Sequence, residues 1–153
     1  MKLAEALILR ADYKRRLEQL KQRLLLNAKV QQGDRPAEQP ADLLRQVDEL
    51  SNLLTRLVQN INLTNASVRL GDEGTIADAI ASRDALRAKH ALFREIANAA
   101  SSGASRVTRS EIKFVSTIDV ARIQSDADRL AQQQRELDAR IQEVNWLTEL
   151  VER

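Results

Sequence analysis

The segment NINLTNAS, residues 60–67, carries two N-x-[ST] sequons, Asn62-Leu-Thr64 and Asn65-Ala-Ser67. Sequons accept glycans in secreted proteins, where they lie on surface loops. This pair instead lies inside a strongly apolar run with helical spacing. The same side chains could form a hydrogen-bonded polar layer in a helical core, or line a pocket for an anion or a small ligand.

Polar side chains also interrupt the apolar rows of the other predicted helices. With a rise of 1.5 Å per residue, each lies on the order of 10 Å from one helix end. In an up-down-up-down bundle these ends share one pole, so the side chains would lie at one height. The candidate polar layer or ligand site consists of Arg10, Asn62, Asn65, Arg83, Asp84 and Asn145. We favour a closed layer that fixes helix register, and keep as the alternative a pocket in which Arg10 and Arg83 bind an anion.

Other residues offer little for catalysis. His90 is the only histidine and lies on an apolar row, where a hydrogen-bonded core role is the better reading. Residue 87 is arginine, so the Glu-x-x-His pair of di-metal bundles is absent. The chain has no cysteine, no G-x-S-x-G motif and no glycine-rich phosphate loop. We therefore expect no enzymatic activity, no metal and no cofactor.

Charge argues against a dedicated nucleic-acid protein. The 24 basic and 22 acidic residues leave a net charge of +2, without the clustered excess of a duplex-binding module. One small basic cluster, Arg106, Arg109 and Lys113, could contact phosphate, although a solvated loop face is the simpler interpretation. Nucleic-acid binding therefore stays a secondary alternative.

Composition favours long helices. Hydrophobic residues make up 43% of the 153 residues, aromatic residues only 3%, and the chain has 4 glycines and 2 prolines. Apolar spacing predicts helices at about 3–31, 41–70, 76–100 and 119–152, with a long loop at 101–118. The predicted fold is a single all-α domain spanning 1–153, an antiparallel four-helix bundle with coiled-coil-like packing.

Local signals mark the predicted helix ends. Pro40 suits the first turn of the second helix, because its missing N–H costs little there. We expect Gly71 to form a left-handed cap after that helix. Thr75 and Asp78 resemble a capping box at the start of the third helix, with aspartate in place of the usual glutamate.

Apolar side chains surround the start of the first helix and the end of the fourth. A helix that is apolar all round is buried on several sides, and a surplus of this kind can form a subunit interface. The candidate oligomer interface consists of Leu9, Trp146 and Leu150, and we expect a homo-oligomer.

No stretch approaches the roughly 20 apolar residues of a membrane span. The opening MKLAEALILR reads as helix rather than signal peptide, so we expect a cytoplasmic protein.

Several segments together resemble a small bacterial family often labelled septicolysin. These are MKLAEALILRADYKRRLEQL at the start, INLTN at 61–65, IADAIASRDAL at 76–86 and EIKFVSTIDVARIQSDADRLAQQQRELDARIQEVNW at 111–146. The resemblance implies an all-helical, oligomeric protein whose function is not established. The label suggests a thiol-dependent cytolysin, but this chain has no cysteine, so the toxin activity is not carried over.

The sequence thus favours a non-enzymatic helical scaffold or interaction protein that associates with itself. An anion-, small-ligand- or nucleic-acid-binding protein is the alternative. A pore-forming cytolysin is the least favoured reading.

Overall fold

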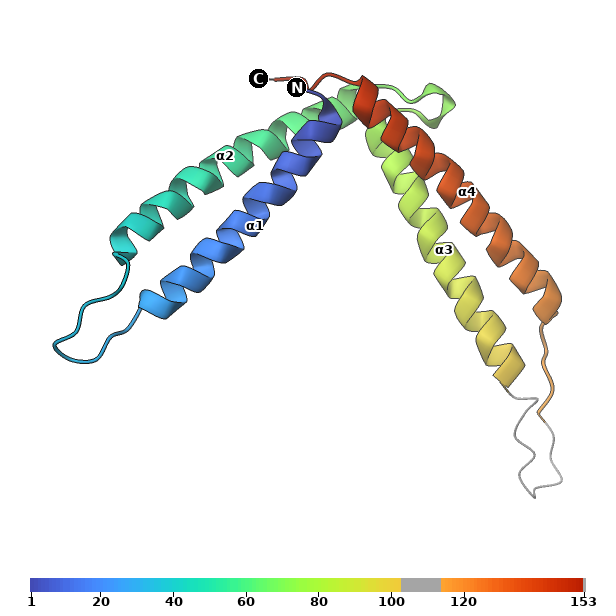
Figure 1. Cartoon of the computed structure of the whole chain (residues 1–153). Helices are drawn as coiled ribbons and strands as arrows, with labels where there is room; N and C mark the ends of the chain where they lie inside the picture. Colours follow the sequence, from blue (N-terminus) through green and yellow to red (C-terminus); the bar gives the residue numbers. More distant parts are fainter. Residues whose placement is uncertain (103–113, 153) are drawn as a thin grey trace. The chain divides into compact units, whose positions relative to one another are not determined.

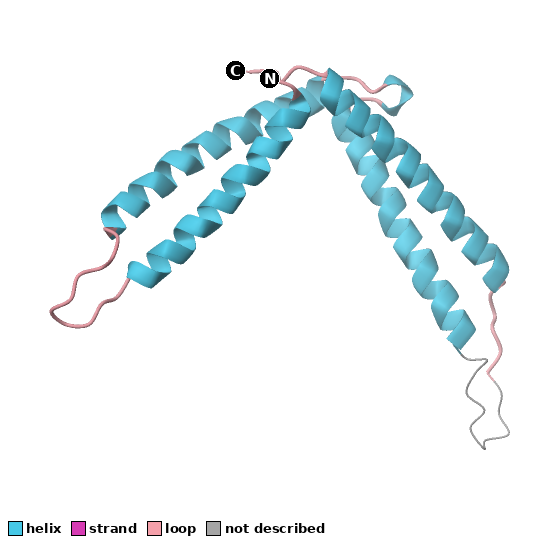
Figure 2. Cartoon of the chain, in the orientation of Figure 1, coloured by secondary structure: helices cyan, strands magenta, loops and turns pink. Residues whose placement is uncertain are grey.

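The computed structural model describes residues 1–102 and 114–152, and this part of the chain is all-α, as predicted. Figures 1 and 2 show long helices joined by loops, and the described residues contain no strand. In chain order the elements are α1 (Leu3–Asn27), α2 (Pro40–Ser67), the short 3₁₀ helix η1 (Gly71–Glu73), α3 (Ile76–Ser102) and α4 (Val120–Leu147).

The helices pack as two antiparallel pairs. The first compact unit comprises Met1–Val68 together with Val144–Arg153, and in it α1 lies along α2 (Figure 1). The second unit comprises Arg69–Glu143, in which α3 lies along α4. Each unit therefore has its own seam of side chains between two helices.

The two seams consist of the apolar rows that the sequence predicts. Three- and four-residue steps put one face of each helix against its neighbour, which removes those side chains from water. In the first unit the buried members of these rows are Leu3, Ala6, Leu20, Leu43, Leu57 and Ile61. In the second unit they are Ile76, Ala79, Ala97, Ala127, Leu130, Leu137 and Ile141.

The fourth helix ends at Leu147, so the predicted end at 152 is wrong. Beyond it the chain continues as an irregular segment that pairs with residues 1–3. The backbone N–H of Leu3 donates to the carbonyl of Thr148 (2.9 Å), and that of Leu150 donates to the carbonyl of Met1 (2.8 Å). These bonds use backbone groups that a longer helix would need for itself. We call residues 1–3 and 148–151 the terminal clasp.

An ion pair reinforces the terminal clasp. The Lys2 ammonium lies 2.7 Å from a carboxylate oxygen of Glu149 and also donates to the carbonyl of Leu147 (3.0 Å). Hydrogen bonds from Lys2 and from the amino group of Met1 hold the pKa of Glu149 below its usual range. The lowered pKa keeps the Glu149 carboxylate ionised, so that it pairs with the ammonium groups of Lys2 and of the N-terminus.

The first helix ends at Asn27, four residues before the predicted end. The Asn27 amide donates to the carbonyl of Arg23 (2.9 Å), and its oxygen accepts from the backbone N–H of Glu38 (3.0 Å). The Arg23 guanidinium also donates to the Glu38 carboxylate (3.0 Å). The Asn27 side chain thus supplies a donor to a carbonyl in the last turn of α1. Its bond with Glu38 holds the following loop against this end of α1.

The second helix begins with Pro40 in its first turn, as predicted, but the predicted cap at Gly71 is wrong. The helix ends at Ser67, whose hydroxyl donates to the carbonyl of Leu63 (2.8 Å). Val68 follows in an extended conformation. Gly71 does adopt a left-handed φ of 52°, but it begins η1 instead of closing α2.

The capping box at the start of α3 is confirmed. The Asp78 carboxylate accepts from the backbone N–H (2.8 Å) and the hydroxyl (2.7 Å) of Thr75, and the Asp78 N–H donates back to that hydroxyl (3.2 Å). Gly74 must remain glycine here. Its φ is 86°, and a Cβ would lie 2.6 Å from the Asp78 carboxylate.

The capping box predicts a pH-dependent contribution to stability. The backbone N–H of Thr75, and then its hydroxyl, hold the pKa of Asp78 below its ordinary value of 3.8. A carboxyl with a lowered pKa stabilises the fold above its unfolded-state pKa, and this contribution disappears as the pH falls through the folded-state pKa. We expect Asp78→Asn to lower Tm at about pH 7, and the difference from wild type to shrink at about pH 3.

Thermal unfolding followed by circular dichroism checks this expectation. Asp72→Asn is the matched control, because Asp72 is an exposed carboxylate of the adjacent η1. A Tm difference for Asp78→Asn that stays constant down to about pH 2.5 would contradict a role for the ionised carboxylate.

Candidate functional site

Thr64 is the buried centre of the NINLTNAS segment. Its side chain is 0% exposed. The hydroxyl donates to the carbonyl of Asn60 (2.8 Å) and accepts from the backbone N–H of Val151 (2.9 Å). Thr64 therefore connects α2 to the terminal clasp across the first unit. Its place on the apolar row was visible in the sequence, but its hydrogen-bond partner 87 residues away was not.

The two sequon asparagines lie in the interior of α2. Asn62 is exposed and Asn65 is half-buried. Glycan acceptors lie on surface loops, whereas these two asparagines lie in a packed helix. Their position therefore favours a role in a polar layer over glycosylation.

The other members of the predicted layer are divided between the units. Arg10 is half-buried on α1, and Asn145 is 4% exposed near the end of α4, both in the first unit. Arg83 and Asp84 belong to the second unit. Among the described residues, every fully buried side-chain nitrogen or oxygen has a hydrogen-bond partner. A single layer that joins all four helices stays a prediction.

Arg83 is held by two carboxylates within the second unit. Its guanidinium donates to Asp84 (3.0 and 2.9 Å) on its own helix and to Asp138 on α4 (3.0 Å). Burial lowers the pKa of Arg83, but the hydrogen bonds that it donates to Asp84 and Asp138 outweigh this effect and raise the pKa above its ordinary value. The side chain is only 18% exposed. Each nitrogen of the guanidinium thus already donates to a carboxylate within the protein, which favours a structural role over capture of an anion.

Removing this guanidinium should destabilise the second unit modestly. We expect Arg83→Met to lower the free energy of unfolding by roughly 1 kcal/mol, because Asp84 and Asp138 lose their partner but remain partly hydrated. Arg87→Met, at an exposed position of the same helix, should change it by less than about 0.5 kcal/mol. A double-mutant cycle with Asp138→Asn checks the cause, and a coupling energy near zero would contradict it.

The remaining sequence candidates fall into two groups. Arg106, Arg109 and Lys113 lie outside the described residues. The proposed interface residues all lie in the first unit, where Trp146 is 54% exposed while Leu9 and Leu150 are half-buried. Within the described ranges, no cluster of histidine, aspartate and glutamate could hold a metal ion.

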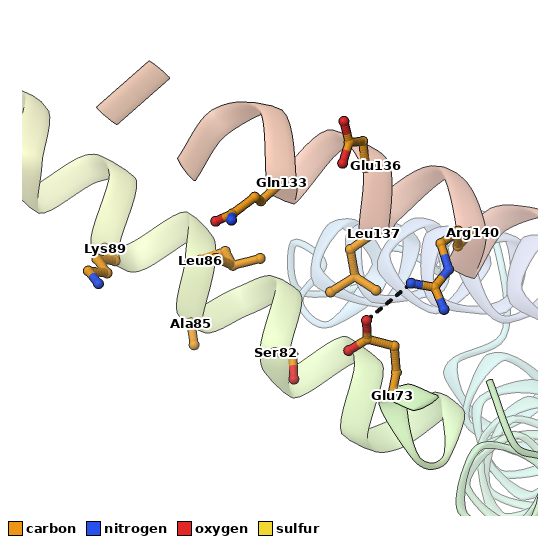
Figure 3. Close-up of a pocket in the computed structure, with 9 residues that line it drawn as sticks. All are labelled: Glu73, Ser82, Ala85, Leu86, Lys89, Gln133, Glu136, Leu137 and Arg140. Atoms are coloured by element: carbon orange, nitrogen blue, oxygen red, sulfur yellow. Dashed lines mark hydrogen bonds and ion pairs between the residues drawn. The ribbon is translucent and has the colours of Figure 1, made fainter. Parts of the chain in front are cut away.

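A groove runs along the second unit between α3 and α4 (Figure 3). Its volume is about 570 Å³. The residues that line it are Glu73, Ser82, Ala85, Leu86, Lys89, Gln133, Glu136, Leu137 and Arg140. Sequence reasoning missed this groove because it followed only the row of α3 that faces α4.

Charged groups line the edges of this α3–α4 groove. At one end Arg140 donates to Glu73 (3.1 Å), so these two charges satisfy each other (Figure 3). Lys89 projects from α3 at the other end, with its ammonium 5.6 Å from the ring centre of Phe93. Glu136 projects from α4 and accepts from the Gln132 amide (2.8 Å). The floor of this groove consists of small and aliphatic groups, and charged groups line its edges. Such a surface is better suited to receive another helix than to form a reaction centre.

Comparison with known proteins places the chain in a family. The model of a family of unknown function, DUF6847, matches residues 10–150. The chain belongs to the DUF6847 family. A solved structure of a functionally unknown conserved protein from Corynebacterium diphtheriae is 44% identical, covers 99% of both chains and superposes with a TM-score of 0.93. The DUF6847 fold described here is therefore also that of an experimentally determined neighbour.

These comparisons do not extend to activity. No curated protein matches this DUF6847 chain. The septicolysin label stays a resemblance that neither the family match nor the solved structure supports. In the described ranges no helix is both long and apolar enough to cross a membrane.

Proposed function

We propose that this DUF6847 protein is a non-enzymatic helical scaffold that works as a homo-oligomer and presents its helix pairs to a protein partner. The exposed apolar side chains of the described helices carry this proposal. A cytoplasmic location and the absence of enzymatic activity remain predictions from the sequence.

Several large aliphatic and aromatic side chains are exposed on the described helices. In the first unit Ile8 is 60% exposed, and Trp146 and Leu147 lie open beside the terminal clasp. In the second unit Leu92 is 53% exposed on α3. Apolar groups of this size at several helix positions mark interaction surfaces when they gather into patches.

Sedimentation equilibrium of the purified chain tests the proposal. We expect a mass that is a multiple of 17.2 kDa and that falls on dilution over roughly a hundredfold range of concentration. A mass of one chain across the whole range would overturn self-association, and with it the scaffold proposal in this form.

A further inference from the structure

The third helix carries a second row of residues in three- and four-residue steps. The first row faces α4 and forms the seam. The second row lies beside it, and its members are mainly exposed: Ser82, Ala85, Lys89, Leu92, Ile96 and Ala99. A helix with two adjacent rows at this spacing can pack against two neighbours at once. One neighbour is α4. Ile96 and Ala99 line a hollow together with residues 114–118, whereas Ser82, Ala85, Lys89 and Leu92 are exposed.

The N-terminal half of this second row lies on the α3 side of the α3–α4 groove, beside Leu86 of the first row (Figure 3). Ser82, Ala85 and Lys89 all line the groove. Small side chains at Ser82 and Ala85 allow another helix to approach closely. The opposite edge belongs to α4, which contributes Gln133, Glu136, Leu137 and Arg140.

Two of the edge charges are of opposite sign and lie on opposite edges. Lys89 projects from α3 and Glu136 from α4, and both are exposed. A two-fold axis that lies in the plane of the interface, passes midway between these residues and is perpendicular to the line joining them exchanges their positions. Such an axis puts Lys89 of each copy over Glu136 of the other, because an isologous interface pairs i with j and j with i.

We propose that the α3–α4 groove is a self-association surface, occupied by the same groove of a second copy through paired Lys89–Glu136 contacts about a two-fold axis. The inference rests on the proposed function and names the surface that carries it. Charge complementarity argues for a second copy, since one groove supplies both members of each pair.

Charge reversal tests the pairing directly. Lys89→Glu puts two carboxylates together at each of the two contacts, and Glu136→Lys puts two ammonium groups together. We expect each single variant to raise the dissociation constant of self-association at least about fivefold, because like charges repel across an interface. Circular dichroism should show unchanged helix content, since both side chains are exposed.

Mixing the two single variants is the decisive step. The Lys89→Glu copy offers two acids and the Glu136→Lys copy offers two bases, so a mixed pair restores both contacts. We expect hetero-association close to wild-type strength, and the double variant Lys89→Glu/Glu136→Lys should associate with itself again. Arg87→Glu and Arg135→Glu are controls on the same two helices, exposed and outside the groove, and should leave association unchanged.

The outcomes separate this inference from the proposed function. A wild-type chain that is monomeric at all concentrations overturns both. An oligomeric wild type whose association is unaffected by either reversal, or whose variants are not rescued by mixing, overturns the groove as the surface and leaves the scaffold proposal standing.

Discussion

Replacing Thr64 with valine is expected to lower the free energy of unfolding by about 1–2 kcal/mol. Valine keeps the branched shape of the buried side chain, so the core loses little packing. The hydroxyl that accepts from the backbone N–H of Val151 is lost, and that N–H is left without its protein partner. Val151 itself is partly exposed, so water can compensate in part, which limits the expected loss.

The matched variants separate the hydrogen bond from packing. Thr64→Ser keeps the hydroxyl and removes one methyl group, so the bond to Val151 should survive. Asn62→Ala, two residues earlier on the exposed face of α2, should change stability by less than about 0.5 kcal/mol. Chemical denaturation measures the change in the free energy of unfolding. Hydrogen exchange shows whether the backbone amide of Val151 loses its protection. If the Val151 amide exchanged at the same rate in wild type and Thr64→Val, the role assigned to Thr64 would be wrong.

The all-α fold class can be predicted from the spacing of apolar residues, because the seam between two helices is built from residues that recur every three or four positions. The buried Leu57 and Ile61 of α2, and Leu130 and Leu137 of α4, occupy positions that the three- and four-residue steps select. The capping box of Thr75 could also be read directly, since its partner is three residues away. Features whose partners are close in sequence are thus accessible without a structure.

Features set by distant partners could not be read in the same way. Thr148 and Val151 continue the row of α4, so periodicity extends that helix to 152. The helix ends at Leu147 because the backbone beyond it binds residues 1–3 and Thr64. Arg83 shows the same limit, since its position on the row of α3 was plain but its partner Asp138 lies 55 residues away.

The α3–α4 groove was missed for a different reason. Its second row, from Ser82 through Lys89 to Ile96, is present in the sequence at regular spacing. The row contains serine, alanine and lysine in addition to its apolar members, so a search for continuous apolar stripes does not select it. The structure reveals it because Glu136 and Leu137 of α4 form the other side.

The largest effect should come from Ile61→Ala. Ile61 is 1% exposed and lies one turn before Thr64 on the same row of α2. Removing three carbons from such a site loses transfer free energy and leaves a cavity that the surroundings fill only in part. We expect the free energy of unfolding to fall by about 3 kcal/mol, measured by chemical denaturation at one fixed protein concentration.

Ile8→Ala is the matched truncation, because the same side chain is 60% exposed on α1 of the same unit. Within one subunit it should cost less than about 1 kcal/mol, since little apolar surface returns to water. If Ile8 lies in a subunit interface, its cost will grow with protein concentration, whereas the cost of Ile61→Ala will not. Equal losses for the two variants at high dilution would contradict the assignment of Ile61 to the core. A much smaller loss for Ile61→Ala would mean that the seam between α1 and α2 contributes little to holding the first unit together.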